Sequence, residues 1–200
     1  MAGATVALAL TAADPAARRA GQVLFPGADV RVLSRAEIRP EAPFAGALFA
    51  LLAAQPRGSC VGLVTPVVWH GPAGPGPSGE PAPPVPGEVV PIVDHVNLEL
   101  LGPLSGRWPD GVPRDFPSMT GIYQPRRVRR RAGARVYSPG VVAAGVADVR
   151  ELTAFESRAV RAEGLRVVSD SLVPAAIVAA FYGLRLAACG LVQVPARDRE

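Results

Sequence analysis

The segment from Gly87 to Tyr123 constrains the fold more than any other part of the chain. It begins with the apolar run from Val89 to Val93, which has the length and the β-branched composition of a buried strand. Polar residues follow at positions 94–98, and ligands in open α/β sheets bind beside the carboxyl ends of strands. The rest of the segment carries four prolines and has no helical or strand periodicity, which is typical of a functional or interface-crossing connection.

The whole chain predicts a single α/β domain over residues 1–200, with a central mixed β-sheet flanked by helices. Its 200 residues can bury one core, and the apolar fraction of 49% is mainly Val, Ala and Leu, as a mostly parallel buried sheet requires. Apolar runs predict strands at residues 5–10, 61–68, 89–93, 136–137, 141–146, 165–168 and 184–194, and a hairpin of residues 23–25 and 30–33. Helical spacing predicts helices at residues 42–54, 147–162 and 174–182, the last closed by Gly183. The Gly- and Pro-rich segment 71–87 predicts a flexible surface loop and not a domain boundary.

The composition excludes several classes of function. All 21 positively charged side chains are arginine, so Schiff-base and lysine-base catalysis is excluded. Cys60 and Cys189 lie far apart in apolar runs, which predicts buried thiols in a reducing compartment and neither a disulfide nor a metal site. No apolar run reaches membrane-spanning length, so we expect a cytoplasmic protein with no membrane partner and no cofactor.

Five arginines crowd into the segment from Arg126 to Arg131. Two interpretations are open: a solvated helix start after Pro125, or a patch that binds nucleic acid. No aromatic residues interleave with these arginines to stack on bases, so the solvated surface is the favoured interpretation.

Two regions resemble the trimeric purine nucleoside phosphorylase and methylthioadenosine phosphorylase family. The first reads GEVVPIVDHVNL, GPLSG and RDFPSMTGIY, where the family has approximately G-D-I-x-x-I-x-D-H-I-N-L, N-P-L-x-G and R-F-P-x-M-S-x-x-Y. The second, between Thr153 and Gln193, reads TAFESR and SDSLVPAAIVAAFYGLRLAACGLV, where the family has T-x-A-E-x-R and G-M-S-T-V-P-E-x-I-V-A-x-x-x-G-L-R-V-x-G-x-S-L-I-T-N. The resemblance implies the family's α/β fold and trimeric assembly. It also implies a pentosyltransferase activity on purine nucleosides, with phosphate as the co-substrate.

The resemblance assigns only part of the family's phosphate site. Arg35 matches the phosphate-binding arginine and Ser171 the phosphate-binding serine, whereas the family's histidine is replaced by Glu37, whose carboxylate would repel phosphate. The glycine-rich phosphate loop is absent, and Thr11 is the only hydroxyl at its place. Residues 67–69 (Val-Val-Trp) replace the small residues that let phosphate and ribose approach the backbone.

The nucleoside side of the site is also altered. The family's purine-binding glutamate falls at Leu152, and the nearest carboxylate, that of Glu151, is displaced by one residue, which turns a helical side chain by ~100°. The family's G-P-S turn before it is replaced by residues 148–150 (Asp-Val-Arg). Asp170 stands where a methionine packs against ribose, and Val194 stands where an asparagine binds the purine, although valine forms no hydrogen bonds through its side chain.

Three functions remain open from the sequence. The first is a phosphorylase-fold protein with eroded phosphate and purine sites, a non-catalytic binding or partner subunit in a homotrimer or in a mixed trimer with an intact homologue. Phe116 supports assembly because it matches the aromatic residue that reaches the neighbouring active site in the family. The second is a divergent phosphorylase that cleaves the N-glycosidic bond of a purine nucleoside. Its surviving polar groups would be Asp94, His95, Asp170 and Ser171. The third, a nucleic-acid binder that uses the arginine cluster, has the least support.

Overall fold

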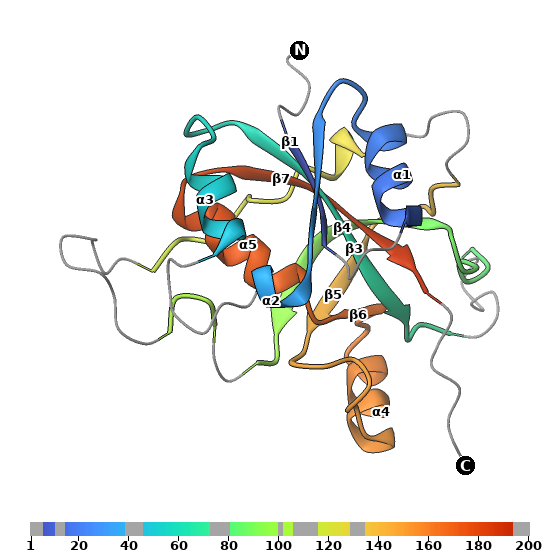
Figure 1. Cartoon of the computed structure of the whole chain (residues 1–200). Helices are drawn as coiled ribbons and strands as arrows, with labels where there is room; N and C mark the ends of the chain where they lie inside the picture. Colours follow the sequence, from blue (N-terminus) through green and yellow to red (C-terminus); the bar gives the residue numbers. More distant parts are fainter. Residues whose placement is uncertain are drawn as a thin grey trace.

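The computed structural model describes residues 6–10, 15–38, 46–72, 81–99, 102–105, 116–128 and 135–193. Within these residues the chain forms a mixed sheet with helices on both sides (Figure 1). The strands are β1 (Val6–Leu10), β2 (Asp29–Leu33), β3 (Cys60–Trp69), β4 (Val89–Asn97), β5 (Val141–Gly145), β6 (Val167–Ser169) and β7 (Arg185–Val192). The helices are α1 (Pro15–Leu24), α2 (Arg35–Ile38), α3 (Ala47–Ala53), α4 (Ala154–Ala162), α5 (Leu172–Phe181) and the short 3-10 helix η1 (Pro125–Arg127). The predicted single-sheet α/β architecture is therefore confirmed.

The first strand shows why the sheet is buried on both faces. All five residues of β1 are buried, and successive side chains of a strand point to opposite faces. Val6, Leu8 and Leu10 join the core cluster that contains α3 and α5, whereas Ala7 and Ala9 pack in the cluster that contains α1. Helices on each face of parallel strands produce this pattern of continuous burial.

The sheet curls until five of its strands form a closed ring. β3 pairs in parallel with β1 and β7, and its last residues, Val68 and Trp69, turn to pair antiparallel with β6. β4 likewise pairs with β7 through Val89 to Pro91 and with β5 further along. Since β5 pairs with β6, the strands β3, β6, β5, β4 and β7 close a circuit from which β1 and β2 extend.

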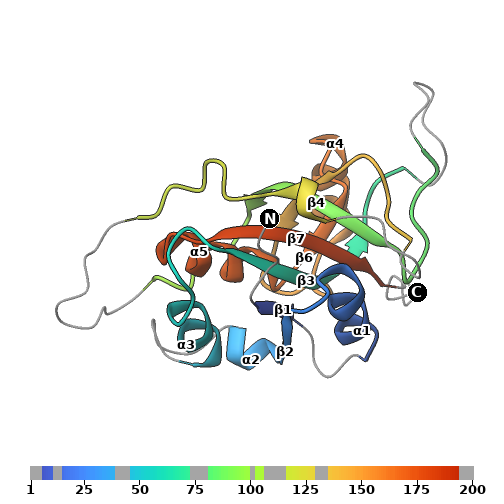
Figure 2. The same ribbon diagram turned by 90° about the horizontal axis from the view of Figure 1, so that it is seen from above.

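Helix α5 contains only apolar residues. It buries seven of its ten residues and packs against α3 and β7. Gly145, at the end of β5, lies so close to this helix that any side chain there would collide with Val173. Gly183 follows the helix at φ 68°, in the left-handed region that ends helices, as the sequence predicted. In two perpendicular views, α4 stands apart from the other helices, below β5 and β6 in Figure 1 (Figures 1 and 2).

The predicted hairpin over residues 23–33 is wrong. Residues 15–24 form α1, and β2 runs parallel to β1 in the register Val6↔Asp29, so the two strands are joined by a helical crossover. The helix buries Ala17, Gly21 and Leu24 on one face, and tertiary packing of this face outweighs the β propensity of its last turn.

The predicted helix over residues 147–162 begins seven residues later than expected, at Ala154. Thr153 caps it: the Thr153 Oγ1 atom accepts a hydrogen bond from the Glu156 N–H at 3.2 Å, and the Glu156 carboxylate accepts one from the Thr153 N–H at 2.8 Å. This capping box marks the true start of α4. The residues before it form the connection that carries Asp148, Arg150 and Glu151.

Two further boundaries differ from the prediction, and several predicted features lie outside the described residues. β4 continues through residues 94–97 (Asp-His-Val-Asn), because these pair with β5, and residues 136–137 contribute only a single bridge between Val136 and Val89. Outside the described residues lie 1–5, 11–14, 39–45, 73–80, 100–101, 106–115, 129–134 and 194–200. These ranges include Thr11, Val194, the first residues of the predicted helix 42–54, part of the surface loop 71–87 and part of the arginine cluster. Of the described helices, none is both long and apolar enough to cross a membrane.

Candidate functional site

The candidate site lies where the carboxyl ends of β1, β2, β5 and β6 meet beside the middle of β3. The register places the end of β1 next to Val64, and the Thr65 hydroxyl lies 3.0 Å from the hydroxyl of Ser169 at the end of β6. Arg35, just after β2, reaches across to Ala147 and Asp148 just after β5. The fold thus brings together segments that lie more than a hundred residues apart in the sequence.

A carboxylate held by two arginines forms the centre of this site. Asp148 is 8% exposed and accepts hydrogen bonds from Arg35 Nη1 at 2.9 Å and from Arg150 Nη2 at 2.6 Å. It also accepts hydrogen bonds from Arg150 Nε at 3.0 Å and from the Arg150 N–H at 2.9 Å. These hydrogen bonds, chiefly those of the Arg150 side chain, hold the pKa of Asp148 well below its usual range. Asp148 is therefore a fixed internal anion.

The arginine that the resemblance assigned to phosphate is engaged by this anion. Arg35 Nη1 donates a hydrogen bond to Asp148, and Arg35 Nη2 donates one to the Ala147 carbonyl oxygen at 2.6 Å. Asp148 and Arg150 were not predicted as site residues. The sequence signal that could have identified them was the Asp-Val-Arg replacement of the family turn, since a carboxylate and a guanidinium two residues apart can close on each other around a bend.

The predicted phosphate serine is also engaged within the chain. Ser171 is 4% exposed and donates its hydroxyl hydrogen bond to Asp170 Oδ1 at 2.7 Å. The N–H groups of Ser171 and Leu172, at the start of α5, both donate to Ser169 Oγ at 3.3 Å. Ser169 in turn shares a hydrogen bond with Thr65, so the donors at this helix start already have buried partners.

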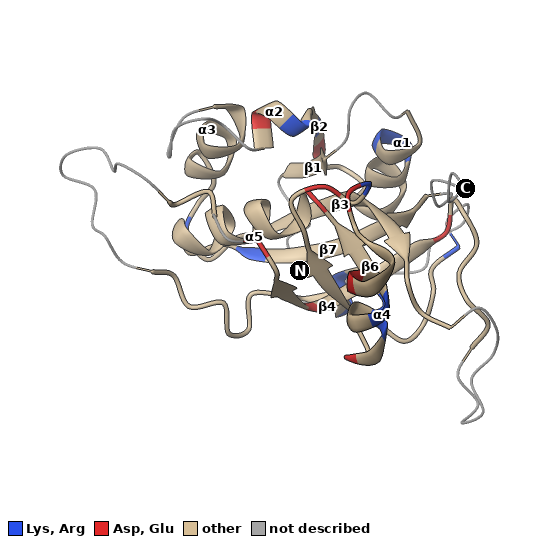
Figure 3. Ribbon diagram, turned by 90° about the horizontal axis from the view of Figure 1, so that it is seen from below, with Lys and Arg blue, Asp and Glu red and all other residues tan. Residues whose placement is uncertain are grey.

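Glu37 stabilises its own short helix. Its carboxylate accepts hydrogen bonds from the Ser34 N–H at 2.8 Å and from the Ser34 hydroxyl at 2.7 Å, and these bonds lower its pKa. Arg35 and Glu37 are the blue and the red residue of α2 in Figure 3. The two side chains therefore face different partners, one at the end of β5 and the other at the start of α2.

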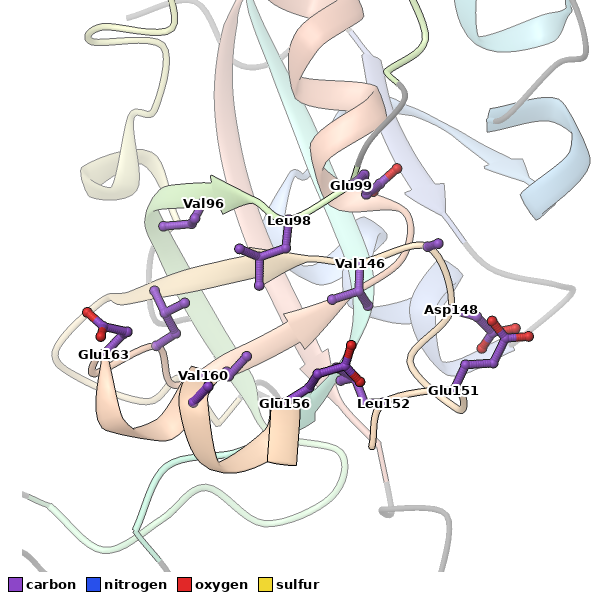
Figure 4. Close-up of a pocket in the computed structure, with 13 residues that line it drawn as sticks. Val96, Leu98, Glu99, Val146, Asp148, Glu151, Leu152, Glu156, Val160 and Glu163 are labelled. Carbon is purple, nitrogen blue, oxygen red and sulfur yellow. The ribbon is translucent and has the colours of Figure 1, made fainter. Parts of the chain in front are cut away.

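Glu151 and Leu152, at the family's purine position, line a groove beside Arg35 and Arg150, which are called the arginine pair from here on. This groove has a volume of about 830 Å³ and lies between α4 and the ends of β4 and β5 (Figure 4). Glu151 is exposed, and its charge acts on Arg150, as does the charge of Asp170. The structure thus links Arg35, Glu151, Asp170 and Ser171 through Asp148 and Arg150, in one region with alternating charge.

Residues 67–69, which the sequence predicted to replace the family's small residues, pack within the chain. Val67 is 1% exposed and belongs to the core. The Trp69 ring packs edge-to-face on Tyr137 at 5.4 Å between ring centroids, and its Nε1 donates to the Pro72 carbonyl at 3.2 Å. These side chains have structural partners within the chain.

His95 belongs to a separate group of contacting residues. Its Nδ1 atom lies 2.8 Å from the Tyr123 hydroxyl, and burial lowers the pKa of His95 and raises that of Tyr123. Asp94 accepts a hydrogen bond from the His95 N–H at 2.8 Å. The described contacts of Asp94 and His95 therefore lead to Tyr123, whereas those of Asp170 and Ser171 lead to Arg150 and to the start of α5.

Phe116 is 89% exposed. Its segment runs to Tyr123, which bridges Leu186 near the amino end of β7.

No protein-family model and no curated protein matches this chain, but solved structures do. A schistosoma purine nucleoside phosphorylase in complex with hypoxanthine superposes with a TM-score of 0.62 at 13% identity, over 98% of this chain and 81% of that chain. Methylthioadenosine phosphorylase from Schistosoma mansoni superposes with a TM-score of 0.59 at 14% identity, over 96% of this chain and 82% of that chain. Isoform 2 of the Schistosoma mansoni purine nucleoside phosphorylase gives 0.48 at 18% identity, over 66% of this chain and 46% of that chain.

The chain therefore has the nucleoside phosphorylase fold over nearly its whole length. At these identities the likeness defines the fold alone, and the chemistry of the site has to be argued from the residues themselves.

Asp148 should make stability depend on pH in the acid range. Because folding lowers its pKa, its ionised form stabilises the fold above the ordinary aspartate value of 3.8, and this contribution is lost as the pH falls below that value. We expect Asp148→Asn to lower the free energy of unfolding by about 1–2 kcal/mol at neutral pH, a range reduced for the solvent exposure of both arginines.

Urea denaturation at pH 7 and at about pH 2.5 would measure this effect, because the difference from wild type should shrink in acid. Asp29→Asn is the matched control, because Asp29 also pairs with an arginine, Arg31, but the two side chains are 59% and 57% exposed. A pH-independent deficit for Asp148→Asn would contradict the assignment.

Proposed function

We propose that this chain is a nucleoside phosphorylase-fold protein that does not catalyse phosphorolysis and acts as a binding or partner subunit. The observation that carries the proposal is the engagement of Arg35 by Asp148 at 2.9 Å. An arginine whose donors are directed at a fixed carboxylate presents little positive charge to phosphate, and that carboxylate repels a second anion.

The phosphate side has further obstacles. Phosphorolysis requires a phosphate dianion beside the ribose, where positive charge develops in the transition state, and removing one positioned donor commonly costs ~10²–10³ in rate. Here the Ser171 hydroxyl donates to Asp170, and the N–H groups of Ser171 and Leu172 donate to Ser169. On the register of the resemblance, phosphate would bind beside Arg35 and Ser171, and the carboxylates that pair with these two residues, Asp148 and Asp170, would repel it.

The purine side supports the same conclusion. Leu152, at the position of the family's glutamate, has no group that could donate to or accept from a base. Glu151 is exposed and interacts electrostatically with Arg150. A nucleoside would therefore lose its directional contacts at both ends, and each lost hydrogen bond to a charged group is worth about 1.5–3 kcal/mol.

We further propose that the chain assembles as a trimer, either with itself or with an intact homologue. The support is Phe116, a large aromatic side chain that is 89% exposed in the isolated chain. Aromatic residues are enriched at interfaces, and the resemblance places this one at a subunit contact.

We expect no detectable phosphorolysis of inosine, guanosine or methylthioadenosine, measured as phosphate-dependent release of free base. Glu37→His should not restore activity, because the Asp148 carboxylate remains between the arginines. Turnover of about one per second, within the ordinary enzyme range, that Ser171→Ala abolishes would contradict the proposal and favour the divergent phosphorylase.

Removing the internal anion should create an anion site. We expect Asp148→Ala to bind inorganic phosphate at least about tenfold more tightly than wild type, because Arg35 and Arg150 lose their shared partner. Calorimetric titration would measure the gain, and adding Arg35→Ala to Asp148→Ala should remove it. An unchanged affinity in Asp148→Ala would show that Asp148 is not what keeps phosphate out.

Light scattering should report a trimer at micromolar concentration, and Phe116→Ala should shift it toward smaller species. Phe155→Ala is a matched control, because Phe155 is 72% exposed on α4 beneath Arg158. A monomer that Phe116→Ala leaves unchanged would count against the trimer.

A further inference from the structure

The groove beside α4 has the size and the floor of a small-molecule site. Its volume of about 830 Å³ lies within the range of 300–1,000 Å³ typical of ligand pockets. The floor is apolar, with Val146, Val160 and Leu165 buried beneath it. Val96 and Leu98 stay 40% and 49% exposed on the opposite wall, so a ligand could remove their apolar surface from water (Figure 4).

The charged side chains that line the groove are acidic, although Arg35 and Arg150 contact one of them, Asp148, from outside the lining. The described lining of the groove contains five carboxylates and no basic residue; the five are Glu99, Asp148, Glu151, Glu156 and Glu163. Two of them have clear structural roles, because Asp148 pairs with Arg35 and Arg150 and Glu156 caps α4.

Glu163 stands where a carboxylate is electrostatically unfavourable. It is the exposed residue that caps the carboxyl end of α4, where the helix dipole places a partial negative charge. Helix ends of this kind favour a cation, and here the helix supplies a negative charge facing an apolar floor. A positively charged ligand in the groove would relieve this repulsion.

We propose that this groove binds a small organic cation, whose apolar body lies on the Val146, Val160 and Leu165 floor and whose ammonium or guanidinium group lies among the carboxylates. Cations are selected because the rim offers only acceptors, while an anion would meet several negative charges within a few ångströms. The groove borders the arginine pair, since Asp148 also lines it, but the proposal does not depend on whether the chain catalyses phosphorolysis.

The test uses three ligands with the same indole ring and different charge: tryptamine, tryptophol and indole-3-acetate. Hexylguanidinium, paired with hexanol, repeats the comparison with an aliphatic body and a different cationic group. Calorimetric titration at low salt should show each cation binding at least about fivefold more tightly than its neutral partner, with indole-3-acetate the weakest. Raising the salt concentration should reduce this preference, because exposed charges are screened.

Variants locate the site. Glu163→Gln should weaken the binding of the two cations by about twofold to fivefold, the usual range for an exposed ion pair. The affinities of tryptophol and hexanol should stay unchanged. Asp29→Asn removes an exposed carboxylate outside the groove and should change nothing. Ala159→Trp, on the exposed groove face of α4, should abolish binding of every probe while circular dichroism shows the fold intact.

Three results would overturn the proposal. One is equal affinity for cations and their neutral partners. Another is binding that survives Ala159→Trp in a folded protein, which would place the ligand elsewhere. The third is the absence of binding by both tryptamine and hexylguanidinium. None of these results bears on phosphate binding by Asp148→Ala, so the two proposals fail separately.

Discussion

The pairing of β3 with three other strands is the constraint on which the rest of the structure depends. Its first eight residues pair with β7, Gly62 to Val64 among them also pair with β1, and its last two residues pair with β6. This one strand therefore closes the ring and brings the ends of β5 and β6 to the ends of β1 and β2. The buried hydrogen bond between Thr65 and Ser169 lies at that junction. Because both residues are shielded from water, removing either hydroxyl would leave the other without this partner and would destabilise the fold.

Asp148 contributes both to the stability of the fold and to the charge of the candidate site. Its two arginine partners join the connection after β5 to the short helix after β2, so the carboxylate holds two separate segments together. The same contacts occupy donors of Arg35 and of Arg150. The single carboxylate also offsets part of the repulsion between two neighbouring guanidinium groups.

The groove beside α4 has the opposite character. Around Asp148, two arginines are hydrogen-bonded to one carboxylate, whereas the groove combines an open apolar floor with an acidic rim. Both features arise from the connection 147–152, because its first residues turn Asp148 toward the arginines and its last ones place Glu151 and Leu152 on the groove. A short change in this connection alters both charge environments at once.

The sequence by itself determined most strands, the helices α3, α4 and α5 and the fold class, because buried runs such as Val61–Val68 and the apolar helix before Gly183 carry their own periodicity. It also drew attention to Arg35, Ser171, Glu151 and Asp170, and their role as site residues stays a prediction. It did not reveal the parallel crossover through α1, because the β propensity of Val23 and Leu24 is local, whereas helix formation there depends on packing against β1 and β3. Only the tertiary structure decided that Arg35 faces Asp148, since the partners lie 113 residues apart and their meeting depends on how β3 closes the ring.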